Sequence, residues 1–325
     1  MNHKKVLRIL ALLLATEVAA VASGPKIVSV ERIWDRGEHN AFTDLIRFRD
    51  RWWCTFREAH DHGGSIGQVR VIVSDDGQQW TSAALLARVG IDLRDPKLSV
   101  TPAGQLMLIM GGSAYDEKDA YETRSPQVAF SRDGRQWTQP EKLLAEDHWL
   151  WRVTWHKGKG YSVSKLGSGR DPRRIMLYST PDGTHWDWVT EFRGLPDWPN
   201  EATIRFAEDD EMVILLRRNK TAWIGTSAPP YREWKWTDTG HRIGGPNFIR
   251  LPNGSMWATG RRYEQQHTTI LARMTRDSYQ PVLTLPSGGD CSYAGMVWHD
   301  GLLWISYYSS HEGKTSIYLA KIKLE

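Results

Sequence analysis

The feature that most constrains the fold of this chain is a short turn motif that occurs three times. The copies lie at residues 74–80, 131–137 and 179–186 and read SDDGQQW, SRDGRQW and STPDGTHW. Each copy follows an alternating apolar run and precedes another strand-like stretch. Asp-Gly between two such runs predicts a hairpin, because Gly adopts positive φ and the Asp side chain bonds its downstream backbone. Spacings of 57 and then 48 or 49 residues indicate a repeat architecture.

Short strands separated by turn residues fill the chain from residue 26 onward, and no helical period interrupts them. They group into units at residues 39–86, 92–144, 149–192, 200–239, 245–285 and 290–324. Units of roughly 40–50 residues with four strands each are typical of propeller blades. The sixth unit has only three strands, and residues 26–33 offer the missing one. We therefore predict an all-β, six-bladed β-propeller that the N-terminal strand closes in the last blade.

The first 22 residues have the pattern of a secretory signal peptide. Basic residues Lys4, Lys5 and Arg8 precede an apolar run over residues 9–22, which ends in the small-x-small sequence AVA. That run is too short for a membrane span, and no later segment is apolar enough for one. We expect an exported protein, periplasmic or secreted, in which residues 23–325 form a single propeller domain.

Composition narrows the classes of partner. The net charge of +4 is spread along the chain without a basic block, and no nucleic-acid-binding motif is present, so we expect no nucleic-acid partner. The 17 tryptophans exceed ordinary usage. Most of them suit blade cores, and the excess suits a glycan-binding surface, where aromatic rings stack on sugar faces.

Cysteine and histidine usage gives no sign of a metal or a disulfide framework. Cys54 and Cys291 fall on strands too far apart for a bridge, so we predict two free, mostly buried thiols. No Cys/His cluster has zinc spacing, and His60-Asp61-His62 is interpreted as a polar loop. We expect no metal and no cofactor.

Polar residues recur at the starts of the predicted innermost strands, which line the central funnel of a propeller. They are His39, Asn40, Arg94, Asp95, Arg152, Asn200, Glu201, Asn247, Asp290 and Tyr293. Buried strand starts are normally apolar, so the convergence of six blades on one polar spot predicts a functional site. A solvated channel mouth is the alternative.

The turn motif resembles the Asp-box of the sialidase superfamily, Ser-x-Asp-x-Gly-x-x-Trp, with some copies one residue shorter. In that superfamily the box lies on the propeller face away from the active site. The segment NEATI, which contains Glu201, and the following ILLR, which ends in Arg217, resemble the Glu and carboxylate-binding Arg of the family. The segment YAGMV, which begins at Tyr293, resembles the segment that carries its tyrosine nucleophile.

Other segments extend the resemblance along the whole mature chain. FREAHD, which ends in Asp61, resembles the loop of the catalytic acid/base, and Asp95-Pro96 resembles an Asp-Pro segment of the second blade. Arg261 or Arg262 ends a strand as the family's second carboxylate-binding Arg does, and Arg262 is the one we assign. The family's Arg-Ile-Pro in the first inner strand is replaced here by HNAFTDL. Arg94 or Arg152 would have to substitute for that arginine.

The resemblance implies an exo-glycosidase that hydrolyses a terminal acidic sugar, sialic acid or a relative, with retention of configuration. Tyr293 would be the nucleophile, Glu201 its activating partner and Asp61 the acid/base. Arg217 and Arg262 would hold the sugar carboxylate. The remaining substrate-binding candidates are Arg94, Asp95, Arg152 and His39.

Two alternatives stay open at the level of sequence. One is a polysaccharide lyase or His-dependent glycosidase that acts on uronate-containing glycans with His39 and Tyr293. The other is a non-catalytic glycan-binding propeller, since a fold does not fix a function. The sequence leaves the sugar, the linkage and the oligomeric state open.

Overall fold

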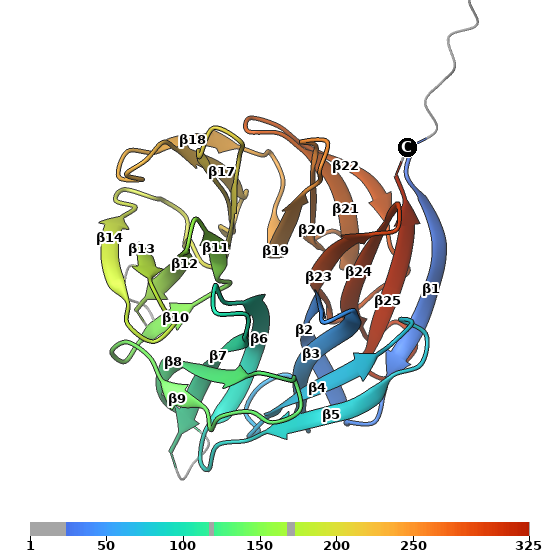
Figure 1. Cartoon of the computed structure of the whole chain (residues 1–325). Coiled ribbons are helices and arrows are strands. Elements are labelled where there is room, and N and C mark those ends of the chain that lie inside the picture. The colour runs from blue at the N-terminus through green and yellow to red at the C-terminus, as the bar shows by residue number, and fades with distance from the viewer. Residues whose placement is uncertain (1–23, 117–119, 168–172, 325) are drawn as a thin grey trace, which may run out of the picture.

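The computed structural model describes residues 24–116, 120–167 and 173–324, and these residues form strands, turns and loops without a helix (Figure 1). The predicted signal peptide, residues 1–22, lies outside the described residues. No helix in the described ranges is long and apolar enough to cross a membrane.

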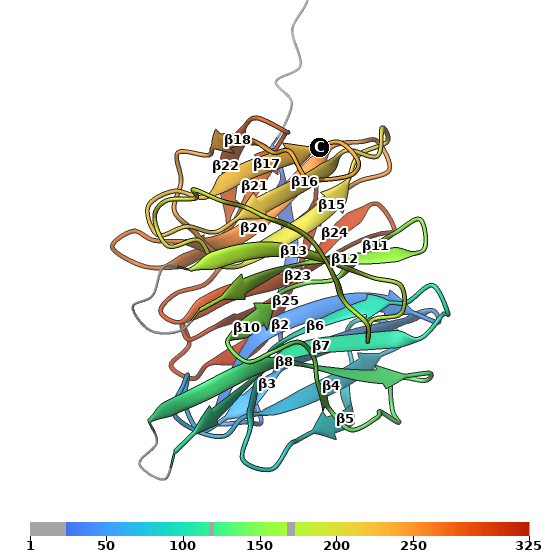
Figure 2. The ribbon, with the colours of Figure 1, turned by 90° about the vertical axis from the view of Figure 1, so that its left-hand side faces the viewer.

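Six sheets stand around a central axis as the blades of a propeller, which confirms the predicted architecture (Figures 1 and 2). Blade 1 contains β2 (His39–Phe48), β3 (Arg51–Ala59), β4 (Gln68–Ser74) and β5 (Thr81–Leu86). Blade 2 contains β6 (Asp92–Val100), β7 (Leu106–Tyr115), β8 (Tyr121–Ser131) and β9 (Glu141–Lys142). Blade 3 contains β10 (His148–Leu150), β11 (Thr154–His156), β12 (Lys159–Leu166), β13 (Arg174–Thr180) and β14 (Asp187–Glu191). Blade 4 contains β15 (Ala202–Phe206), β16 (Met212–Leu216), β17 (Trp223–Ser227) and β18 (Lys235–Asp238). Blade 5 contains β19 (Ile243–Arg250), β20 (Met256–Arg262), β21 (Thr268–Met274) and β22 (Tyr279–Thr284).

Blade 6 is assembled from both ends of the chain. Its strands β23 (Cys291–His299), β24 (Leu302–Ser309) and β25 (Ser316–Lys323) are completed by β1 (Lys26–Trp34), in the order β1-β25-β24-β23. The antiparallel pairing runs from Lys26 opposite Lys323 to Trp34 opposite Ile317. The predicted closure by the N-terminal strand is therefore confirmed, and the outer edge of β25 is covered.

The three turn motifs join the third and fourth strands of blades 1 to 3. In the first two copies the backbone N–H of the glycine donates to the hydroxyl of Ser74 or Ser131, at 2.8 Å in each case. In the third copy Gly183 donates instead to Thr180 Oγ1 at 2.7 Å, so Thr180 rather than Ser179 begins the motif. All three copies consequently have the same length.

The glycines of these turns touch the preceding blade. Gly134 has φ +75°, and a Cβ on it would lie 2.3 Å from ring atoms of Trp53 in blade 1. Gly183 meets Met107 of blade 2 in the same way, and Gly77 meets Trp304 of blade 6. Each motif thus fixes both a turn and a close contact between blades.

We expect Gly134→Ala to lower the free energy of unfolding by roughly 1–3 kcal/mol more than Gly104→Ala does. Gly104 has a similar φ of +72° but nothing within 4 Å of its added Cβ, so it isolates the backbone strain. Denaturant unfolding of both variants measures the difference. Equal losses would show that the contact with Trp53 does not constrain the turn.

The innermost strands of four blades share a bulge near their starts. The pairing register shifts between Ala41 and Asp44, Arg94 and Lys97, Gly244 and Asn247, and Ser292 and Gly295. The bulges contain Phe42, Asp95, Gly245 and Tyr293, with φ of 64°, 52°, 56° and 52°. Positive φ is costly for side chains other than glycine, and such bulges cluster at functional sites.

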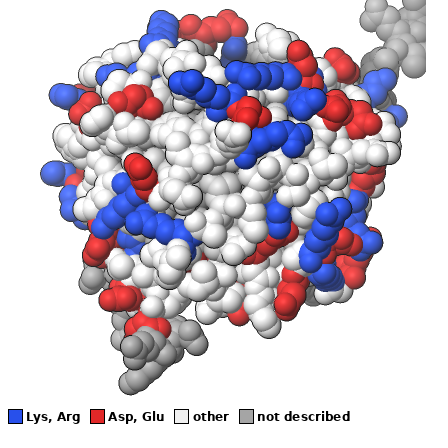
Figure 3. Space-filling view, turned by 60° about the horizontal axis from the view of Figure 1, so that its bottom comes forward, with Lys and Arg blue, Asp and Glu red and all other residues white. Residues whose placement is uncertain are grey.

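The charged side chains of the surface are of mixed sign, and both cysteines are buried. On the face drawn in Figure 3, basic and acidic side chains are interspersed and neither sign covers the surface. Cys54 and Cys291 are free and buried, as predicted.

Candidate active site

Tyr293, Glu201 and Arg217 form the centre of the site. Tyr293 lies on the bulge of β23, Glu201 directly precedes β15, and Arg217 directly follows β16. The Tyr293 hydroxyl donates to Glu201 Oε1 at 3.0 Å, and Arg217 Nη1 donates to both oxygens of Glu201 at 2.8 Å. Arg217 Nη1 also lies 2.9 Å from the Tyr293 hydroxyl. The contact that the sequence predicted between Tyr293 and Glu201 is therefore present.

Electrostatics give the three groups distinct protonation states. Burial would raise the pKa of Glu201, but the charge and hydrogen bonds of Arg217, helped by Lys165, lower it below its ordinary value. Burial and the Glu201 carboxylate raise the pKa of Tyr293 well above its ordinary value. At neutral pH the site therefore holds a neutral phenol against an ionised carboxylate.

A second cluster adjoins this centre and contains Arg261, not Arg262. Arg261 donates to Asp290 Oδ1 at 3.0 Å and to the Tyr308 hydroxyl at 2.7 Å, and its guanidinium carbon lies 5.7 Å from the Tyr293 ring centre. Arg262 turns to the other side of β20, where it pairs with Glu264. Successive side chains of a strand point to opposite faces, so the assignment of Arg262 is corrected by one residue.

His39 and His62 both face Asp290. His39 Nε2 lies 3.0 Å and His62 Nδ1 lies 2.6 Å from Asp290 Oδ2. Burial opposes ionisation of Asp290, but the two histidines and Arg261 lower its pKa. The three possible ligand atoms lie within 4.8 Å of one another. The permanent charge of Arg261 on the same carboxylate disfavours a metal cation there, so the group is better described as a hydrogen-bonded network.

Arg94 and Asp95 lie beside the same network, on β6. Arg94 donates to the backbone oxygen of His62 at 3.2 Å, and its guanidinium carbon lies 5.1 Å from the Phe42 ring centre. Asp95 Oδ1 is buried and has no hydrogen-bond partner among the described residues. Burial raises the pKa of Asp95, although Arg94 and Lys97 oppose the shift. Asp95 is thus a carboxyl group that takes up a proton more readily than an ordinary aspartate does.

Asp61 lies at the rim, in the loop after β3. Arg57, which is fully buried and paired with Asp92 at 2.7 Å, donates to the backbone oxygens of Asp61 and Ser65 and so holds this loop. The Asp61 side chain is exposed and accepts a hydrogen bond from the Ser65 hydroxyl at 2.8 Å. That bond lowers the pKa of Asp61. In this arrangement Asp61 contacts neither Tyr293 nor Glu201.

Arg152 lies deeper along the axis than predicted. It follows β10 rather than starting it, and its Nη1 contacts both oxygens of the buried Asp44 at 2.7 Å. It lines a cavity of about 290 Å³ with Arg205 and Met296 rather than the Tyr293 cluster. The innermost strand of blade 3 is split into β10 and β11. Arg152 lies between these two parts and not at the start of the strand, where the sequence had placed it.

Sequence reasoning missed several residues of the site. Tyr263 accepts a hydrogen bond from Arg217 Nη2 at 3.2 Å, and Tyr308 donates to Asp290 at 2.8 Å. Lys165 lies at the end of the second strand of blade 3, the place that Arg261 occupies in blade 5. Searching second-strand ends as well as first-strand starts would have found Lys165 and Tyr308.

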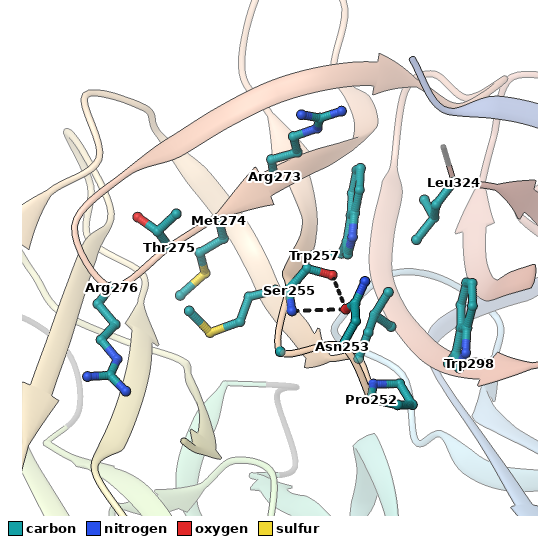
Figure 4. Close-up of a pocket in the computed structure, with 13 residues that line it drawn as sticks. Pro252, Asn253, Ser255, Trp257, Arg273, Met274, Thr275, Arg276, Trp298 and Leu324 are labelled. Atoms are coloured by element: carbon teal, nitrogen blue, oxygen red, sulfur yellow. Dashed lines mark hydrogen bonds between the residues drawn. The ribbon is translucent and has the colours of Figure 1, made fainter. Parts of the chain in front are cut away.

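A cavity of about 670 Å³ lies at the opposite end of the strands from this site (Figure 4). The turn between β19 and β20 forms one wall, where Ser255 donates to Asn253 Oδ1, and Trp298 and Leu324 line another side. Trp298 lies near the far end of β23 from Tyr293. The cavity is therefore separate from the Tyr293 cluster.

Six blades, of which blade 3 has five strands and the others have four, give this chain a sialidase-like six-bladed β-propeller fold. A solved structure of a Dyadobacter fermentans protein of unknown function is similar to it, with a TM-score of 0.81 at 16% identity over 93% of this chain and 100% of that chain. An α-L-arabinofuranosidase from Fusarium graminearum has a TM-score of 0.69 at 13% identity over 91% and 98% of the two chains.

Trypanosoma rangeli sialidase, solved in complex with sialic acid, has a TM-score of 0.70 at 12% identity. The match covers 92% of this chain and 59% of the sialidase chain, so this chain corresponds to only part of that enzyme. No protein-family model and no curated protein matches the sequence. At these identities the similarity shows the fold, and the chemistry has to be argued from the site.

Proposed function

We propose that this protein is an exported retaining exo-glycosidase that removes a terminal acidic sugar from a glycan. The observation that supports it best is the buried Tyr293–Glu201 pair, with the hydroxyl 3.0 Å from the carboxylate. A carboxylate nucleophile would be repelled by an anionic sugar, whereas a neutral phenol is not. Arg217, Arg261 and Arg94 around the pair supply the positive charge that an acidic sugar requires.

Tyr293 would attack the anomeric carbon while its proton passes to Glu201. The glycosyl–tyrosine bond forms as the bond to the leaving oxygen breaks, and water then hydrolyses the intermediate. Arg217, which donates to both oxygens of Glu201, keeps this carboxylate a weak base. When Arg217 shares its charge with a sugar carboxylate, the pKa of Glu201 rises and Glu201 accepts the phenol proton more readily. Binding of an acidic sugar would in this way activate the nucleophile.

The leaving oxygen requires a proton donor, and Asp95 meets this requirement better than Asp61 in this structure. Asp95 has a raised pKa and an unpartnered buried oxygen, whereas Asp61 is exposed with a lowered pKa. We expect Asp95→Asn to reduce kcat/KM about 10²–10⁴-fold on substrates with poor leaving groups. Activated aryl glycosides should be affected far less.

Asp61→Asn is the matched variant for that comparison. A selective loss on poor leaving groups in Asp61→Asn, with Asp95→Asn unaffected, would restore the assignment drawn from sequence. The measurement is steady-state kinetics with a series of aryl glycosides whose phenols differ in acidity.

The experiment that tests the proposal is covalent trapping. The protein is incubated with aryl glycosides of acidic sugars that carry fluorine next to the anomeric carbon, which slows hydrolysis of the intermediate. Peptide mapping should locate the sugar on Tyr293, and NMR of the unmodified reaction should show retained configuration. An adduct on another residue, or inversion, would contradict the mechanism.

One observation favours a second candidate, a lyase or His-dependent glycosidase for uronate-containing glycans. His39 and His62 converge on Asp290 beside the same aromatic cluster, and the buried His39 Nδ1 has no partner among the described residues. An imidazole oriented by a carboxylate is a suitable general base. A product that absorbs in the near ultraviolet would identify the unsaturated sugar of a lyase reaction.

A further inference from the structure

Three basic side chains lie together where blades 2 and 3 border the Tyr293 site. Lys165 is near the end of β12, Arg124 is in β8, and Arg173 directly precedes β13. Lys165 Nζ and the Arg124 guanidinium carbon lie 5.9 and 5.7 Å from the ring centre of the same residue, Trp149. Arg173 lies 5.5 Å from the ring centre of Trp198. We call Arg124, Lys165 and Arg173 the basic cluster.

No carboxylate makes an ion pair with the basic cluster in the part of the chain that the structure describes, although Glu201 and Asp95 act on it at longer range. Lys165 is only 7% exposed, and neither it nor Arg173 makes a hydrogen bond or ion pair within the described part of the chain. Arg124 donates to the backbone oxygen of Gly167, and its Nε is buried without a partner. Burial, together with Arg124 and Arg173, lowers the pKa of Lys165 to about 7. Buried cations without partners are unfavourable unless a ligand supplies the missing charge.

The cluster also lies close enough to the Tyr293 site to act on the same ligand. Lys165 interacts electrostatically with Glu201 and Asp95, and Arg173 interacts with Glu201 and Arg217. The N–H donors of the basic cluster are nevertheless distinct from those of the two arginines of the Tyr293 site. Arg217 is paired with Glu201, and Arg261 is paired with Asp290. One ligand could therefore place separate charges at the two positions.

We propose that Arg124, Lys165 and Arg173 form a second anion-binding subsite, which takes a carboxylate or sulfate group of the glycan other than the one held at Arg217. The inference rests on the proposed function for the identity of the ligand, but the anion site can be tested without turnover. Guanidinium and ammonium donors together suit an oxyanion. The substrate class is then a glycan with at least two anionic groups.

The first arm of the test measures binding of inorganic sulfate. Wild type, Lys165→Met, Lys165→Arg and Lys159→Met are titrated with sodium sulfate against sodium chloride of equal ionic strength, at pH 6, by calorimetry. Lys159 is an exposed lysine at the other end of β12 and is the matched control. We expect Lys165→Met to weaken sulfate binding at least about tenfold, because one charge-assisted contact is lost. Lys165→Arg and Lys159→Met should bind as wild type does.

Arg217→Met separates the two anion positions. If sulfate binding is lost in Arg217→Met but kept in Lys165→Met, or if wild type does not bind sulfate, the second subsite is overturned. Circular dichroism checks that Lys165→Met is folded, and the charge-preserving Lys165→Arg keeps the test decisive if it is not.

The second arm compares acidic disaccharides with a charge on one sugar or on both. Lys165→Met should lower kcat/KM about tenfold more on the doubly charged disaccharide than on the singly charged one. If neither disaccharide is cleaved while Lys165 still governs sulfate binding, the glycosidase proposal fails and the anion subsite stands. Equal effects on both disaccharides would overturn a role for Lys165 in recognising the second charge.

Discussion

Replacing Tyr293 by Phe should reduce turnover at least about 10³-fold, because removing a nucleophile abolishes the covalent route. The substitution keeps the ring, which lies 5.1 Å from Phe42 between ring centres, and it leaves Glu201 paired with Arg217. Substrate affinity should therefore change little, and the free energy of unfolding should fall by only about 1 kcal/mol. Single-turnover kinetics and equilibrium binding measure the two quantities separately.

Tyr307→Phe is the matched control for this prediction. Tyr307 is also buried and donates one hydrogen bond, to the backbone oxygen of Pro286 at 2.8 Å, but it does not contact the Tyr293 cluster. Tyr307→Phe should have the same turnover number as wild type. If Tyr293→Phe remains active while His39→Gln is inactive, the His-dependent mechanism replaces the tyrosine mechanism. A glycan-binding module would show affinity without turnover in every variant, wild type included.

Deleting residues 24–34 should abolish the folded, soluble protein. The deletion removes β1 and exposes the hydrogen-bonding edge of β25, which invites aggregation. It also removes Trp34, a buried residue whose indole N–H donates to Glu58 Oε1 at 2.6 Å and so ties blade 6 to blade 1. Size-exclusion chromatography and circular dichroism should show aggregates or unfolded chain.

Folding of the deletion variant should be restored when the same strand is attached to the C-terminal end of the chain. Because Lys26 pairs with Lys323, residues 24–34 can follow residue 325 through a short turn and re-enter the same position. This permuted protein should fold and be soluble, whereas a scrambled strand of equal composition should not rescue it. Folding of the simple deletion variant would show that closure by β1 is not required for stability.

The architecture could be predicted from the sequence because its signals are local. Alternating apolar runs and Asp-Gly turns define the blades, and the three-strand sixth unit required a strand from elsewhere. The central pair could be placed for the same reason: Glu201 and Tyr293 each stand at the start of an innermost strand, and closed blades bring such starts together.

The remainder of the site depends on features that a sequence pattern does not contain. Arg152 was misplaced because the inner strand of blade 3 breaks into two parts, and Arg262 was chosen over Arg261 because a one-residue register decides which face a side chain occupies. Lys165 was missed because a lysine in an alternating strand is indistinguishable from a solvent-facing one. Only the packing around Trp149 shows that it is buried.

The bulges at the inner strands imply a conflict between stability and the proposed function. A residue that raises the melting temperature at a bulge can remove a side chain that the proposed reaction needs. Asp95 and Tyr293 adopt the left-handed region that glycine occupies without strain, as Gly245 does in the equivalent bulge of blade 5. Asp95→Gly would relieve that strain and would also remove a carboxyl group whose Oδ1 is buried without a partner among the described residues. A library screened for melting temperature alone would therefore accumulate glycine at position 95 and, on the proposed function, would lose the proton donor with it.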